Sequence, residues 1–105
     1  VARQWKMIEP NGEKWNSVLD EFIERDYFIN PTMVIYEASR NLSDSRNAVW
    51  HEEYTLPSMM DFYTPNLEDH GSYFFNWTTH DEVAWKNFYD RWMAFLDDYK
   101  DRGAA

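Results

Sequence analysis

The chain has no cysteine and only three glycines among its 105 residues. Without cysteine it has neither disulfides nor thiolate metal sites, and a reducing compartment is the default expectation. Three widely spaced glycines do not make the glycine-rich loop that cradles a phosphate group. No apolar run approaches the roughly 20 residues that cross a membrane, and the chain has no signal-peptide pattern. We therefore expect a cytoplasmic location.

Basic residues are also scarce. The 10 Lys and Arg stand against 19 Asp and Glu, which gives a formal net charge of −9 at pH 7. Binding to nucleic acid or to an anionic membrane depends on clustered cations. We therefore expect neither as a partner. The acidic residues are scattered among apolar ones, a pattern that is typical of a solvated surface.

Aromatic residues, in contrast, are abundant. Six Trp, seven Tyr and seven Phe make up 19% of the chain. Aromatic side chains bury large areas in a core, and they also line ligand pockets and partner surfaces. The length allows at most one domain, and no repeat or flexible linker divides the chain.

Two segments have the apolar period of amphipathic helices, one over residues 12–25 and one over residues 80–102. For the second, Thr79 is the predicted N-cap and Glu82 the matching acid of a capping box. The apolar stripes consist of Trp15, Val18, Leu19, Phe22 and Ile23 in the first helix, and of Val83, Trp85, Phe88, Tyr89, Trp92, Met93, Leu96 and Tyr99 in the second.

Residues 27–36 predict one main strand, because the run is almost continuously apolar and rich in β-branched and aromatic side chains. Pro31 cannot donate to a ladder, so a shorter strand ending near Asn30 is also consistent. A buried strand needs partners for its backbone groups, and little in this chain offers them. The pattern indicates an α/β fold that is a slice of a larger βα structure. A small mainly-α domain is the alternative.

An aromatic-rich insertion, residues 38–79, separates this strand from the last helix. A weak apolar stripe predicts a helix around residues 44–54, and Pro57 predicts the start of a short one. Long loops after a strand often act as lids over a pocket. The insertion's aromatics either form such a lid or pack only against each other. They include Trp50, Tyr54, Tyr63, Tyr73, Phe74 and Trp77.

Pockets of parallel α/β folds form beyond the carboxyl ends of the strands. The candidate pocket-lining residues are therefore Pro31, Thr32, Tyr36 and Glu37, which end or follow the strand. His70 joins them because it lies in an irregular loop, where functional residues concentrate.

No catalytic residue and no metal ligand is predicted. His51 and Glu52 match the first two residues of the helical zinc motif H-E-x-x-H, but Thr55 occupies the position of the second histidine. No nucleophile elbow is present, and spacing alone selects no catalytic pair among the carboxylates.

Several stretches of the chain resemble one family. They are residues 19–22, 28–36, 51–58, 84–86, 92–95 and 99–103. They are similar to metal-dependent amidohydrolases of the imidazolonepropionase and prolidase kind, in which a late barrel strand is an apolar run that ends in Pro-Thr. The resemblance implies a late segment of a (β/α)₈ barrel, with Pro31 and Thr32 lining its pocket.

The resemblance also implies the chemistry of an intact parent protein. A divalent, zinc-like metal would activate a water molecule to attack an amide or related bond of a small-molecule substrate. The family's His-x-His and Asp ligand motifs have no match in this chain, so the chain alone should be inactive and hold no metal itself. Two alternatives stay open. One is a self-contained, aromatic-rich helical binding module. The other is a homo-oligomer in which the unpaired strand finds its partner in a second copy.

Overall fold

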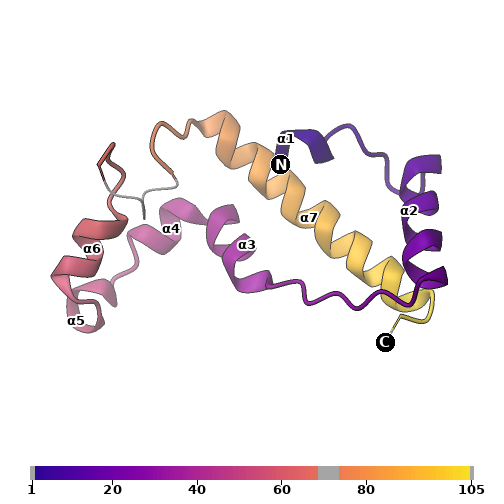
Figure 1. The fold of residues 1–105 in the computed structure, drawn as a ribbon. Coiled ribbons are helices and arrows are strands. Elements are labelled where there is room, and N and C mark those ends of the chain that lie inside the picture. The colour runs from indigo at the N-terminus through magenta and orange to yellow at the C-terminus, as the bar shows by residue number, and fades with distance from the viewer. Residues whose placement is uncertain (1, 69–73, 105) are drawn as a thin grey trace.

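The computed structural model describes residues 2–68 and 74–104, and this part of the chain is mainly helical. The helices are α1 (Ala2–Trp5), α2 (Glu13–Glu24), α3 (Met33–Arg40), α4 (Leu42–Arg46), α5 (His51–Tyr54), α6 (Pro57–Tyr63) and α7 (Thr79–Asp101). The long α7 runs through the molecule, with α2 beside its C-terminal end and α3 and α4 below its N-terminal half (Figure 1). The described residues thus agree with the mainly-α alternative and do not support the α/β fold that was expected first.

The helix predicted over residues 80–102 is confirmed as α7, although its N-cap is Thr78 rather than Thr79. The backbone N–H and the hydroxyl of Thr78 both donate to the Asp81 carboxylate, at 2.9 and 2.8 Å. Helix α7 ends before Gly103, which has a φ of 95°. This left-handed conformation strains residues with a Cβ and suits glycine.

The helix predicted over residues 12–25 is confirmed as α2. Its apolar stripe faces the last turns of α7, where Trp15 and Leu19 pack with Phe95 and Tyr99. Leu19 is completely buried. The Tyr99 hydroxyl donates to the backbone carbonyl of Tyr27, so the segment after α2 is tied to the same core. The core therefore lies where α2 meets the C-terminal half of α7.

The strand predicted over residues 27–36 is wrong. Residues 27–32 form neither helix nor strand, and residues 33–40 form α3. The chain turns at Thr32, whose φ of 46° is left-handed and breaks an extended run. After Pro31, four consecutive apolar residues fit a helix as well as a strand, because so short a run has no decisive period. No strand occurs anywhere in residues 2–68 and 74–104.

The insertion contains more helices than its sequence pattern predicts. In place of one helix around residues 44–54 there are two, α4 and α5. The side chain of Asn47 donates to the carbonyl oxygen of Ser43 at 2.8 Å, which satisfies a terminal carbonyl of α4 and ends that helix. The short helix predicted to begin at Pro57 is confirmed as α6.

Candidate interaction surface

The four predicted pocket residues that lie in the described part of the chain have different surroundings. The Tyr36 ring packs against α7, 6.3 Å from the Trp85 ring and 5.4 Å from the Phe88 ring between centroids. Thr32 and Glu37 are exposed, and Pro31 is half-buried. The Tyr36 ring therefore attaches α3 to α7 by packing and does not line a pocket. The fifth predicted residue, His70, lies outside the described residues.

A hollow of about 580 Å³ lies between α1 and α7, and Arg3, Lys6 and Arg91 are among the residues that line it. Two of these cations are already engaged. Arg3 pairs with Asp81 at 2.6 Å, and Arg91 donates to the carbonyl oxygens of Trp5 and Ile8 at 2.5 and 2.8 Å. The hollow is accordingly a seam where α1 is attached to α7.

No group of three or more His, Asp or Glu side chains in the described part of the chain could hold a metal ion. His51, which begins the partial zinc motif of the sequence, makes two hydrogen bonds within the protein instead. Its Nε2 lies 2.7 Å from the Ser45 carbonyl oxygen and its Nδ1 lies 2.8 Å from the Thr55 hydroxyl. Since a carbonyl only accepts, Nε2 carries the proton. His51 thus ties α5 to α4.

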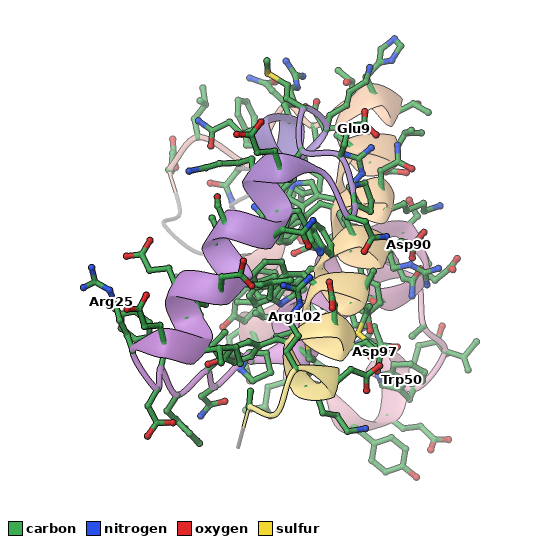
Figure 2. All side chains as sticks on the ribbon, turned by 90° about the vertical axis from the view of Figure 1, so that its right-hand side faces the viewer. Glu9, Arg25, Trp50, Asp90, Asp97 and Arg102 are labelled. Atoms are coloured by element: carbon green, nitrogen blue, oxygen red, sulfur yellow. The ribbon has the colours of Figure 1, made fainter. Side chains whose placement is uncertain are left out.

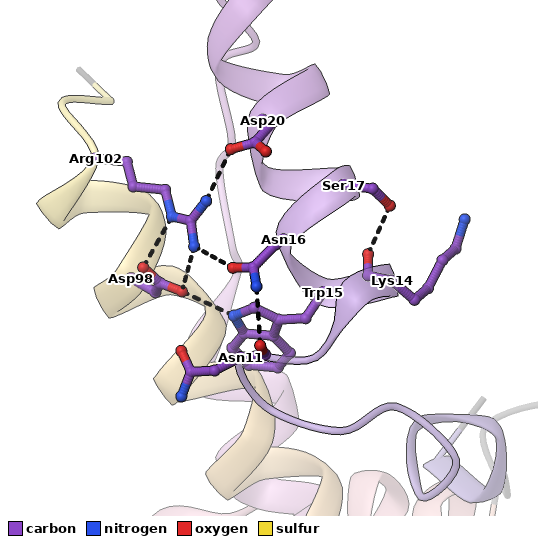
Figure 3. A network of polar contacts seen from close by, with 8 residues as sticks. All are labelled: Asn11, Lys14, Trp15, Asn16, Ser17, Asp20, Asp98 and Arg102. Carbon is purple, nitrogen blue, oxygen red and sulfur yellow. Dashed lines mark hydrogen bonds and ion pairs between the residues drawn. The ribbon is translucent and has the colours of Figure 1, made fainter.

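A polar network fastens α2 to the end of α7 (Figure 3). The Trp15 indole donates to the Asp98 carboxylate at 2.8 Å. Arg102 donates to Asp98 at 3.0 Å, to Asp20 at 2.8 Å and to the Asn16 amide oxygen at 2.5 Å. Hydrogen bonds from Arg102, and then from Trp15, lower the pKa of Asp98. In Figure 2 the Arg102 side chain lies between the two helices.

The aromatics of the insertion divide into two groups. Phe74 and Trp77 pack against each other with ring centroids 4.9 Å apart, and Trp77 stacks on Trp85 of α7 at 5.6 Å. Trp50, Tyr54 and Tyr63 are exposed instead. Tyr73 lies outside the described residues. Only the first group extends the core.

Residues 49–67, here called the arm, form the candidate interaction surface. The arm carries α5 and α6, at the end of the molecule opposite α2 (Figure 1). None of its residues is buried. Met60 is partly buried. The other eight large apolar side chains expose between 42% and 84% of their surface; they are Val49, Trp50, Tyr54, Leu56, Met59, Phe62, Tyr63 and Leu67. Large exposed apolar patches are typical of interaction sites, which makes the arm the candidate.

The molecule as a whole has more surface than its mass requires. Its accessible surface is 8162 Å², whereas a folded monomer of this mass exposes roughly 6,300 Å². The radius of gyration is 17.0 Å, against about 13 Å for a compact chain of this length. The excess area exceeds the roughly 800 Å² that one partner buries in a standard protein interface.

The arm also lies in the most one-sided charge region of the chain. Between Arg46 and Lys86 there is no Lys or Arg. The same region contains seven acidic residues: Glu52, Glu53, Asp61, Glu68, Asp69, Asp81 and Glu82. The site predicted from the sequence, a pocket at the end of a strand, did not include this surface. The absence of basic residues was the sequence signal that could have indicated it.

No protein-family model, curated protein or solved structure matches the chain. No helix of the described residues is both long enough and apolar enough to cross a lipid bilayer. The amidohydrolase resemblance thus stays a prediction.

Proposed function

We propose that the chain is an interaction module, in which the core of α1, α2, α3 and α7 presents the arm to a protein partner. One observation carries this proposal: all but one of the arm's large apolar side chains are exposed, although the same chain buries aromatic side chains along α7. The alternative in which the insertion's aromatics pack only against each other does not account for Trp50 and Tyr54.

Energetics support the same proposal. Burying one large apolar side chain contributes about 1.5–3 kcal/mol of favourable free energy. A partner that covers several of the arm's exposed side chains would therefore gain a substantial binding free energy. Trp and Tyr are the residue types that most often dominate binding energy at interfaces. Trp50 and Tyr54 both belong to the arm and lie next to the His51 attachment to α4, which gives them a defined position.

Position-specific photo-crosslinking tests this function. The photo-reactive residue benzoyl-phenylalanine replaces Tyr54 of the arm in the full chain. This variant is produced in cells of the organism from which the chain comes, so that natural partners are present. The matched control places the same group at Phe28, an aromatic that is 80% exposed outside the arm. We expect a discrete crosslinked species from position 54 only, competed by excess unlabelled chain but not by a Trp50→Ser, Phe62→Ser variant. Equal crosslinking from both positions, or none from position 54, would overturn the proposal.

A second candidate is the segment of an amidohydrolase-like barrel. The excess surface also favours it, because a segment taken from a larger fold exposes area that its parent covers. In this proposal the intact parent, and not this chain, holds a zinc-like metal. The coding sequence on both sides of the chain tests it. The proposal expects a His-x-His strand upstream and an Asp-bearing strand soon after Gly103. Flanks without these motifs contradict it.

A further inference from the structure

The arm combines apolar anchors with charge of one sign. Glu52 and Glu53 lie on α5 and Asp61 lies on α6, and all three side chains are exposed among the apolar residues. No Lys or Arg occurs in the arm. The surface therefore has a negative potential that no cation of its own segment offsets, and a complementary partner carries positive charge beside its apolar contacts.

The charge argues against the other occupants of such a surface. A second copy of this chain would bring an equally acidic arm and a further net charge of −9 to the contact, and like charges across an interface are unfavourable. Nucleic acid and an anionic membrane are repelled for the same reason. A cationic protein segment is the occupant that fits both properties of the arm.

The side chains of the arm favour a helical partner segment. Two short helices at the end of an elongated molecule present rings and thioethers, with Met59 half-exposed beside Phe62 on α6. Flexible Met and flat aromatic side chains adapt to the apolar stripe of a partner helix. Amphipathic helices dock through anchors spaced at i, i+3, i+4 and i+7, while their polar face meets the charges around the contact.

We propose that the arm binds a cationic amphipathic helix, one with Lys or Arg flanking its apolar stripe, in a partner protein. This inference rests on the proposed function, since it specifies the partner of the same surface. The apolar side chains of the arm supply most of the affinity. Glu52, Glu53 and Asp61 select the sign of the partner's charge and speed its association.

Two synthetic helical peptides test the inference with the full chain. They share one Leu-based apolar stripe, and one has Lys while the other has Glu on the flanking positions. We expect the Lys peptide to bind at least ~10-fold more tightly than the Glu peptide at about 50 mM salt, and this preference to shrink at about 500 mM salt, where surface charges are screened. Equal binding of the two peptides, or no binding of the Lys peptide, would overturn it.

A matched pair of variants locates the site. E52Q/E53Q/D61N removes three carboxylates from the arm, and E9Q/E13Q/E24Q removes three exposed carboxylates near or on α2. We expect only the first variant to lose the preference for the Lys peptide, while both keep the helical circular dichroism of the parent. An equal loss in both variants would show nonspecific attraction and contradict the proposed site.

The two proposals fail in different ways. If crosslinking from position 54 succeeds but the Lys peptide does not bind, the arm is an interaction surface and the cationic helix is the wrong partner class. If both experiments fail, the interaction module itself is contradicted. Self-association of the full chain that is lost in the Trp50→Ser, Phe62→Ser variant would contradict the charge argument, because it would make a second copy the occupant.

Discussion

At the scale of single residues, Asp98 has the clearest structural role. Its carboxylate accepts hydrogen bonds from the indole of Trp15 and from Arg102, and so joins the core of α2 to α7. Trp15 is only 2% exposed. Without Asp98 its indole N–H has no acceptor in the network, and a buried donor without a partner is costly.

The substitution Asp98→Ala should therefore lower the free energy of unfolding by about 1–3 kcal/mol. Its neighbour Asp97 is exposed, so Asp97→Ala should change it by no more than ~0.5 kcal/mol. Urea unfolding followed by far-ultraviolet circular dichroism measures both. Equal effects of the two substitutions would mean that the network does not hold α2 to α7.

Asp81, at the start of α7, should make the stability of the fold depend on pH. Hydrogen bonds from the backbone and hydroxyl of Thr78, followed by the one from Arg3, lower the pKa of Asp81 from 3.8 to about 2. A carboxyl group whose pKa is lowered by folding stabilises the fold above its ordinary pKa, and this contribution disappears as the pH falls through the folded value.

The substitution Asp81→Asn should accordingly lower Tm near neutral pH, and its effect should shrink steadily as the pH falls from about 4 to about 2. Thermal melts of Asp81→Asn and the parent chain across this range test the sign. Asp101→Asn, an exposed position at the other end of α7, is the control and should not reproduce the loss. A deficit in Tm that is as large at pH 2 as at neutral pH would contradict the electrostatic explanation.

At the scale of elements, the core and the arm should respond differently to substitution. Leu19→Ala removes a completely buried side chain from α2 and should cost about 2–5 kcal/mol. Trp50→Ser and Phe62→Ser remove larger side chains from the arm but should each change the unfolding free energy by only ~0.5 kcal/mol, because both are exposed. Urea unfolding measures all three. A loss near 2 kcal/mol for either arm variant would mean that the arm is packed.

The same contrast explains which elements could be predicted. Helices α2 and α7 repeat their apolar period over three or more turns, so their type is unambiguous and each end is predicted to within one residue. Residues 33–36 offer only four apolar positions, and a strand and a helix fit them equally. The N-cap was misplaced by one residue because Thr78 and Thr79 are both followed, three positions later, by an acid.

The candidate site could be predicted only in part. An aromatic-rich insertion is visible in the composition, but the division of its rings between core and surface depends on tertiary packing. Trp77 reaches Trp85 of α7, whereas Trp50 lies beyond α4 and does not. Sequence spacing does not encode that difference. The absence of basic residues between Arg46 and Lys86 does point to the acidic arm, and it depends on sequence alone.

At the scale of the whole molecule, the elongated shape follows from where the apolar side chains lie. The molecule measures 48 × 27 × 23 Å, with its core where α2 meets the C-terminal end of α7 and the arm at the opposite end of the molecule (Figure 1). Segments with few buried contacts open more readily than the core. Stability should therefore fall from α2 and the end of α7 toward the arm.

Hydrogen–deuterium exchange of the isolated full chain, resolved by segment, tests this account most directly. We predict that amides of α5 and α6 exchange about a hundred times faster than those in the C-terminal half of α7, and that the Lys peptide slows exchange in the arm alone. Equal protection of the arm and α7 in the isolated chain would contradict the account, because it would mean that the arm is already packed and presents no surface to a partner.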